Sequence, residues 1–136
     1  MKFSCWARWY NYTKRLRDRL REPGVYLLAH FHRVPKGVAN PRSRRVIYIG
    51  ESCASLRQRL GQFGRDVFKN RDEHSGAKTY KKKFKTRKRH LLCVAVLSVK
   101  KGRRKDDLCH SYIKFTEAKL LYEFVKTHGE KPECNK

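Results

Sequence analysis

The amino-acid sequence predicts an α/β (α+β) sandwich, in which a small three-stranded antiparallel sheet is flanked by helices. Short apolar runs at residues 25–31, 46–49 and 91–99 have the length and the Val, Ile, Leu and Tyr content of strands. Segments with helical periodicity precede, separate and follow these runs. The chain has 136 residues, of which 39% are hydrophobic and 12% aromatic, so it can fill a core of its own. We therefore expect a single domain over residues 1–136.

The first two strands are expected to form an antiparallel hairpin. A Pro-Gly pair precedes the first strand, and Gly50 ends the second. The connecting residues 32–45 contain prolines, a glycine and an asparagine, which indicates a long loop. Residues 91–99 are dense in Val, Leu and Cys, which predicts a central strand that is covered on both faces.

Helices are predicted around these strands. Residues 3–20 place aromatic residues and leucines at helical spacing among arginines, which predicts an amphipathic N-terminal helix. Ser55 can cap a helix over residues 55–69. The apolar stripe of that helix consists of Leu56, Leu60, Phe63 and Val67. A last helix covers about residues 113–128, and residues 70–89 are expected to be loop with some helix.

The composition of the chain indicates which class of partner the protein binds. The 35 Lys and Arg residues exceed the 12 Asp and Glu residues, and the net charge of +23 favours a phosphate-rich partner. The charge gathers in residues 81–89 and 100–105 rather than on an amphipathic basic helix, which favours nucleic acid over a membrane surface. No apolar run approaches the length of a membrane span, and the N-terminus lacks the apolar segment of a secretory signal. We therefore expect a cytoplasmic protein with no membrane partner.

The cysteines favour reduced thiols. Their number, five, is odd, and no two of them form a CxxC pair, unlike the disulfide framework of a small extracellular domain. The alternative is a zinc site, for which the ligands would be Cys93, Cys109, His110 and Cys134. Their spacings match no standard ligand pattern, so we do not expect this site.

Two charged residues border the predicted apolar faces. On a helical wheel, Arg59 lies about 60° from the apolar stripe and Arg57 about 100° to the other side, so Arg59 borders the buried face. Glu117 lies inside the apolar arc of the last helix, where a lone carboxylate costs several kcal/mol. It must be protonated, paired with an arginine or bound to a cation, and these alternatives stay open at this point.

Five features in fixed order resemble the GIY-YIG nuclease superfamily. They are Gly24-Val25-Tyr26, Tyr48-Ile49-Gly50, Leu56-x-x-Arg59-Leu60, Glu117 and Pro132-x-x-Asn135. Either triplet alone is weak, but the ordered set covers residues 24–135. The resemblance implies a nuclease core over that range, preceded by an N-terminal helical extension at residues 1–22.

The resemblance implies a metal-dependent DNA endonuclease with one Mg²⁺ (or Mn²⁺) ion per active site and no organic cofactor. Glu117 would bind the ion, Arg59 would hold the scissile phosphate, and Tyr26 and Tyr48 would flank the attacking water. A histidine beyond the arginine helix occurs in some relatives, which makes His74 a further candidate for proton transfer. The implied catalytic residues are Tyr26, Tyr48, Arg59, His74, Glu117 and Asn135.

The expected partner is double-stranded DNA, contacted through its backbone by basic residues outside the site. These residues are Arg44, Arg45, Arg57, Lys78, Lys81, Lys82, Lys83, Lys85, Arg87, Lys88, Arg103 and Arg104. A stand-alone domain with a long hairpin loop is most similar to a restriction-type enzyme, which would act as a homodimer to cut both strands. A phage, mobile-element or repair nuclease is an alternative. An alternative of another class is a non-catalytic, basic nucleic-acid-binding protein that keeps the fold.

Overall fold

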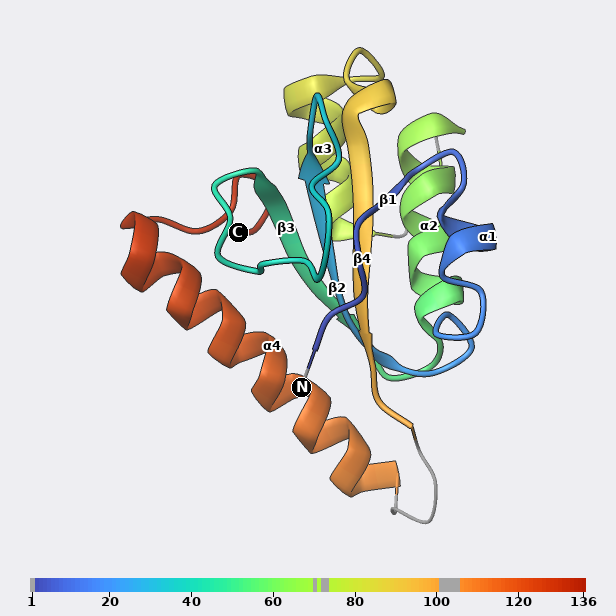
Figure 1. Ribbon diagram of the computed structural model, residues 1–136, viewed down its shortest axis with the longest axis vertical. Helices are drawn as coiled ribbons and strands as arrows, with labels where there is room; N and C mark the ends of the chain where they lie inside the picture. Colours follow the sequence, from blue (N-terminus) through green and yellow to red (C-terminus); the bar gives the residue numbers. More distant parts are fainter. Residues whose placement is uncertain (1, 70, 72–73, 101–105) are drawn as a thin grey trace.

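The computed structural model describes residues 2–69, 71, 74–100 and 106–136 (Figure 1). Within these residues the chain forms a four-stranded antiparallel sheet with helices on both faces. Helix α4 covers one face, and α1, α2 and α3 lie on the other (Figure 1). Each face of the sheet carries its own cluster of buried apolar side chains. The expectation of an antiparallel sheet flanked by helices is therefore confirmed as a mixed α/β fold.

The predicted hairpin is present. Strands β2 (Gly24–His30) and β3 (Val46–Ser52) pair in antiparallel fashion, with Tyr26 opposite Gly50. All seven residues of β2 are buried, because β2 lies inside the sheet with β3 on one side and β4 on the other. Strand β3 lies at the edge of the sheet. The two tyrosine-bearing strands are therefore neighbours, one central and one at the edge.

The N-terminal segment corrects two predictions. Strand β1 (Ala7–Arg8) pairs with β4 (Leu92–Ser98), so the described sheet has four strands and not the three expected. The prediction of one helix over residues 3–20 is wrong for most of that segment, because only α1 (Tyr12–Arg15) is α-helical there.

The physical reason is that the N-terminal segment completes the edge of the sheet beside β4. Ser4 and Trp9 donate backbone hydrogen bonds of 2.8 and 2.9 Å to carbonyl groups of β4. The apolar side chains then divide between the two faces, with Trp6 in the core on the α4 side and Trp9 on the α2 side. The apolar residues of this segment have the spacing of one helical stripe in the sequence, but in the structure they pack on both faces of the sheet.

Helix α2 (Leu56–Phe68) forms as predicted. The hydroxyl of Ser55 accepts a hydrogen bond of 3.1 Å from the backbone N–H of Gln58, and all four residues of the predicted stripe are buried. Helix α3 (Ser75–Phe84) lies in the segment that was expected to be loop with some helix. Its N-cap is His74, a residue type that propensity alone does not select for this role.

Helix α4 (Asp106–His128) begins earlier than the predicted range of 113–128. Asp106 and Asp107 lie in its first turn, where negative charge interacts favourably with the helix dipole. Glu117 consequently lies in the middle of a long helix. The short 3₁₀ helix η1 (Arg89–Leu91) leads into β4. In the described part of the chain, no helix combines the length and the apolar character that crossing a membrane requires.

Candidate active site

The predicted site residues come from both helical layers and meet at edge strand β3. Tyr26 and Tyr48 lie on the hairpin, Arg59 on α2, His74 at the start of α3, and Glu117 on α4. The charges of Arg59 and Glu117 shift the pKa values of both phenols in opposite directions. Arg59 and Glu117 are therefore near enough to both phenols for their charges to act on them.

Tyr26, Tyr48 and His74 form a buried aromatic cluster. The ring centroids of the two tyrosines lie 5.9 Å apart, and the His74 ring lies 5.5 Å from that of Tyr48. Phe63 packs edge-on against His74 at 5.4 Å. Tyr26 and His74 are fully buried, whereas Tyr48 is half-buried. Of the two phenols, Tyr48 is therefore the one that solvent reaches.

The hydrogen bonds of His74 fix its tautomer. The backbone N–H of Ala77 donates to Nδ1 of His74 at 3.2 Å, so this nitrogen carries no proton. Burial, together with the charge of Arg59, lowers the pKa of His74 to about 4, so its ring is neutral at neutral pH. The proton of the neutral ring is therefore on Nε2, which lies 2.6 Å from the hydroxyl of Tyr26 and donates to it.

A chain of hydrogen bonds leads from His74 to Tyr48. Burial raises the pKa of Tyr26 well above its ordinary value. A hydrogen bond between the phenols raises the pKa of Tyr26 and lowers that of Tyr48, as expected when Tyr26 donates. Burial raises the pKa of Tyr48, but Arg59 and a hydrogen bond from Ser75 oppose this effect. Tyr48 is therefore the phenol whose ionised form the site stabilises better.

Two glycines make room for the tyrosine rings. A Cβ atom at Gly50 would lie 2.5 Å from ring atoms of both Tyr26 and Tyr48. A Cβ atom at Gly76 would lie 2.5 Å from the Tyr48 ring. Real Cβ atoms do not approach ring carbons so closely, because van der Waals contact begins at about 3.5 Å. The absence of side chains at Gly50 and Gly76 thus leaves the space between β3 and the first turn of α3 that the Tyr48 ring fills.

The charged half of the site is more open. Arg59 and Glu117 are half-buried, whereas Arg57 is exposed, as the helical wheel predicts. Nη1 of Arg59 donates to Oε1 of Gln62 at 2.8 Å. The carboxylate of Glu117 has no hydrogen-bond or ion-pair partner among the described residues. The interpretation of Glu117 as one half of a structural salt bridge is therefore not supported in the described part of the chain.

A second carboxylate lies beside Glu117. Glu51, the residue after the Tyr-Ile-Gly triplet, forms an ion pair of 2.6 Å with Lys114. Burial and the charge of Glu51 raise the pKa of Glu117, while Lys114 and Arg59 lower it. Because Lys114 is engaged by Glu51, the negative charge of Glu117 stays available to another cation.

A cavity lies beside Arg59, although neither Glu117 nor the two tyrosines belong to its lining. Its volume is about 370 Å³. The residues that line it are Glu51, Ser52, Cys53, Ala54, Gln58, Arg59, Gln62 and Lys114. It places the guanidinium of Arg59 on a solvent-accessible surface with space for a phosphate group.

Asn135 secures the open edge of β3. Its side-chain oxygen accepts from the backbone N–H of Ile49 at 2.9 Å, and its side-chain nitrogen donates to the Ile49 carbonyl at 3.0 Å. Cys134 donates from its backbone N–H to the carbonyl of Ile47 at 2.8 Å. Cys134 and Asn135 thus bond to the backbone of β3. Asn135 holds the backbone next to Tyr48 and does not touch the phenols through a hydrogen bond.

The donor atoms at the site suit a hard divalent cation. The described residues contain no group of three or more His, Cys, Asp or Glu side chains that could hold a metal ion, and all five cysteines are unpaired. Mg²⁺ keeps several waters and is commonly bound through one or two carboxylates plus substrate phosphates. The accessible carboxylate of Glu117 beside Arg59 fits such an ion.

The basic residues predicted to contact DNA occupy several regions. Those on α3 and the following turn, at positions 78–88, are exposed except for the half-buried Lys81. Arg44 and Arg45 precede β3 and are exposed. The basic run at 81–89 precedes β4 in the chain, whereas the run at 100–105 falls, apart from Lys100, outside the described residues. Arg103 and Arg104 lie outside the described residues.

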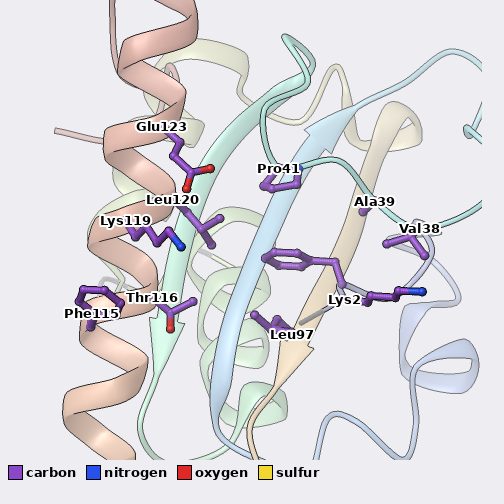
Figure 2. Close-up of a pocket in the computed structure, with 11 residues that line it drawn as sticks. Lys2, Val38, Ala39, Pro41, Leu97, Phe115, Thr116, Lys119, Leu120 and Glu123 are labelled. Carbon is purple, nitrogen blue, oxygen red and sulfur yellow. The ribbon is translucent and has the colours of Figure 1, made fainter.

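An apolar cavity elsewhere is separate from the site. It lies between α4, the N-terminal segment and the loop before β3, with Leu97, Phe115 and Leu120 among its lining residues (Figure 2). Its volume is also about 370 Å³, but none of the predicted catalytic residues lines it.

Sequence reasoning missed four residues of the site. They are Glu51, Ser75, Gly76 and Lys114. Ser75 and Gly76 directly follow His74, and Glu51 directly follows Gly50, so adjacency to a motif was the signal that could have found three of them. Lys114 carries no local signal, because its role depends on how α4 packs against β3.

Comparison of the chain with protein-family models, with curated proteins and with solved structures finds no match.

Proposed function

We propose that this protein is a metal-dependent DNA endonuclease that resembles the GIY-YIG nuclease superfamily. The observation that carries the proposal is the meeting of two phenols, a guanidinium and an accessible carboxylate at edge strand β3. The net charge of +23 supports a polyanionic substrate. Double-stranded DNA is the proposed substrate class.

Arg59 is proposed to hold the scissile phosphate. The planar guanidinium matches two phosphate oxygens and stays charged at every relevant pH. Its place in the cavity beside Glu51 and Lys114 leaves it reachable from solvent. Arg59 would therefore neutralise the charge that develops on the phosphate as water attacks.

Tyr48 is proposed to position the attacking water and to accept its proton. Its oxygen receives hydrogen bonds from Tyr26 and Ser75, and Arg59 also lowers its pKa against the effect of burial. These contacts offset only part of the effect of burial, so the pKa of Tyr48 is still raised, but they bring the phenolate, the form that can take a proton, within easier reach than at Tyr26. His74 acts one step further away, because its Nε2–H donates to Tyr26 and orients that hydroxyl toward Tyr48. His74 is thus a positioning residue.

Glu117 is proposed to bind one Mg²⁺ or Mn²⁺ ion. When bound, such an ion neutralises charge on the phosphate and stabilises the departing 3′ oxygen. The protein contributes the carboxylate, which lies on α4 and whose charge raises the pKa values of both phenols. Lys114 and Glu51 pair with each other beside it and leave the Glu117 oxygens available.

Cutting both strands of a duplex would involve a second copy of the chain. Leu108, Phe115 and Tyr122 lie on α4 at seven-residue spacing and are 62%, 64% and 65% exposed. A seven-residue spacing keeps side chains on nearly one side of a helix. This exposed apolar stripe supports a homodimer of restriction type, in which α4 packs against α4 of the partner.

Incubation of supercoiled plasmid with the protein tests the proposal. We expect nicked or linear product with Mg²⁺ or Mn²⁺ and none with a chelator. Glu117→Ala should abolish cutting while DNA binding persists, and Glu123→Ala, on the same helix, should cut normally. A wild-type protein that binds DNA but never cuts it, with any divalent metal, would favour the non-catalytic nucleic-acid-binding alternative.

A further inference from the structure

A second basic site lies at the start of α2, outside the candidate active site. The segment around α1 lies beside the first turn of α2 (Figure 1). Side chains from both line a cavity of about 320 Å³. Its lining residues are Thr13, Lys14, Arg17, Leu20, Arg21 and Arg57. The four cationic side chains are exposed, and no carboxylate of a described residue lines the cavity. Asp18 and Glu22 belong to the same segment but are not part of the lining.

The framework of this cavity is rigidly attached to the fold. Tyr12, Leu16 and Leu20 are buried at four-residue spacing, so the basic residues between them face outward. The carbonyl of Leu20 accepts from the backbone N–H of Arg57 at 2.9 Å, and that of Glu22 accepts from Leu56 at 2.9 Å. The cations are therefore placed by folded structure and not by a free basic tail.

Four like charges around one concave surface repel each other unless an anion joins them. A cleft lined by one sign of charge focuses its field and concentrates counter-ions of the opposite sign. Arginine forks match the oxygens of a phosphate, and the Thr13 hydroxyl adds a hydrogen-bond donor to the lining. The chemistry of the cavity is thus that of a phosphate site.

The position of the cavity relates it to Arg59. Arg57 and Arg59 belong to the same turn of α2 and lie on opposite sides of its apolar stripe. Their side chains are separated by about the diameter of a helix, roughly 10–12 Å. A DNA strand that crosses the first turn of α2 would meet both of them.

We propose that the cavity formed by Lys14, Arg17, Arg21 and Arg57 binds a backbone phosphate that flanks the scissile phosphate of the substrate. This inference rests on the proposed function, from which the DNA ligand is taken. It assigns a role to the N-terminal extension: residues 12–21 extend the DNA-binding surface beyond Arg59 and set the path of the strand. Such a contact positions the backbone without reading sequence.

The salt dependence of DNA binding tests this inference. The variant Lys14→Gln/Arg17→Gln/Arg21→Gln is compared with Arg33→Gln/Lys36→Gln/Lys131→Gln, which removes the same charge from exposed residues elsewhere. Affinity for a short duplex is measured at several salt concentrations in the presence of chelator. Each phosphate contact contributes about 0.9 to the slope of log K against log salt. We expect the magnitude of this slope to decrease by about 0.9 more in the cavity variant than in the control, as the loss of one phosphate contact requires.

Two outcomes would overturn the inference. The first is an equal change of slope in both variants, which would show only a general effect of charge. The second is a cavity that binds free phosphate alone. In that case inorganic phosphate would raise the melting temperature of the wild type but not of the cavity variant, and the salt dependence of DNA binding would be the same in both. Both variants must keep the circular dichroism spectrum and melting temperature of the wild type.

The measurement also separates this inference from the proposed function. A wild-type protein that does not cut DNA, together with a selective loss of slope in the cavity variant, would contradict nuclease activity and support the phosphate site. A wild-type protein that cuts DNA, with equal slopes in the two variants, would support nuclease activity and contradict the phosphate site.

Discussion

The two halves of the candidate site differ in how the fold holds them. Tyr26 and His74 are fully buried, hydrogen-bonded to each other and packed against aromatic rings. Arg59 and Glu117 are half-buried; Arg59 donates a hydrogen bond to Gln62, and the charges of Glu51, Lys114 and Arg59 act on Glu117. The buried half is therefore part of the hydrophobic core and also contains candidate catalytic groups. The charged half lies at the protein surface, next to that core. Substitutions in the two halves should have different signatures.

The largest effect is expected in the charged half, at Arg59. Arg59→Ala should lower the single-turnover cutting rate by about 10²–10³-fold, because it removes a preorganised charge from the transition state. The melting temperature should change little, since the side chain is only half-buried and its hydrogen-bond partner Gln62 can turn to water.

Arg57→Ala is the matched control on the same helix turn. It should weaken DNA binding and reduce its salt dependence but leave the cutting rate at saturating DNA within a few-fold of wild type. Equal cutting rates for the two variants would contradict the role of Arg59.

In the buried half, Gly50→Ala should affect stability and activity together. The added methyl group would overlap both tyrosine rings, and overpacking of a core costs about 1–3 kcal/mol. Chemical denaturation and plasmid cutting measure the two effects on the same protein.

Gly61→Ala on α2 is the control. There the new Cβ atom meets only the end of the Arg65 side chain at 3.3 Å, and alanine is the better helix former by up to about 1 kcal/mol. A Gly50→Ala protein as stable and active as Gly61→Ala would show that the tyrosine rings have room to move.

The buried histidines should make stability depend on pH. Burial lowers the pKa values of His74 and His30 to about 4 in the folded protein, against about 6.5 when unfolded. Between these values the unfolded chain binds more protons, so stability is complete above about pH 6.5 and falls as pH decreases toward 4. Each histidine contributes a slope of at most about 1.4 kcal/mol per pH unit.

Urea denaturation between pH 7 and 5 measures this slope. His74→Asn, which keeps an N-cap side chain, should reduce the slope by up to one proton, and adding His30→Gln should reduce it again. A slope unchanged in the double variant would contradict the neutral, buried state of both rings.

The smallest effect is expected at Asn135. Asn135→Ala removes two hydrogen bonds to Ile49, but water can replace them at the sheet edge, so the cost should be about 1 kcal/mol. Cutting should fall a few-fold because Tyr48 is adjacent to the loosened residue. Asn40→Ala, which removes one exposed turn hydrogen bond, should leave cutting unchanged.

Elements with dense apolar patterns could be predicted from the sequence, and elements defined by tertiary contacts could not. The strands β2, β3 and β4 follow from short, dense apolar runs, and the buried stripe of α2 follows from helical periodicity. The N-terminal strand β1 depends on hydrogen bonds to β4, and α3 depends on a histidine cap. Neither feature leaves a local signal in the sequence.

The candidate site likewise has residues that local sequence patterns predict and residues that only tertiary contacts reveal. Ordered motifs predicted its tyrosines, Arg59 and Glu117, because these residues lie on elements whose spacing is regular. The pairing of Glu51 with Lys114 joins β3 to α4 across 63 positions of sequence, so only the folded chain reveals it. His74 was predicted as a proton-transfer candidate, and its hydrogen bonds instead support a positioning role.

The central claim is that Glu117 binds a divalent cation beside the two phenols at edge strand β3. Paramagnetic broadening by Mn²⁺, followed in the NMR signals of the tyrosine rings, tests this claim without reference to activity. We predict that Mn²⁺ broadens the ring signals of Tyr48 and Tyr26 in the wild type and in Glu123→Gln, but not in Glu117→Gln. Equal broadening in Glu117→Gln, or unbroadened tyrosine signals in the wild type, would contradict the account.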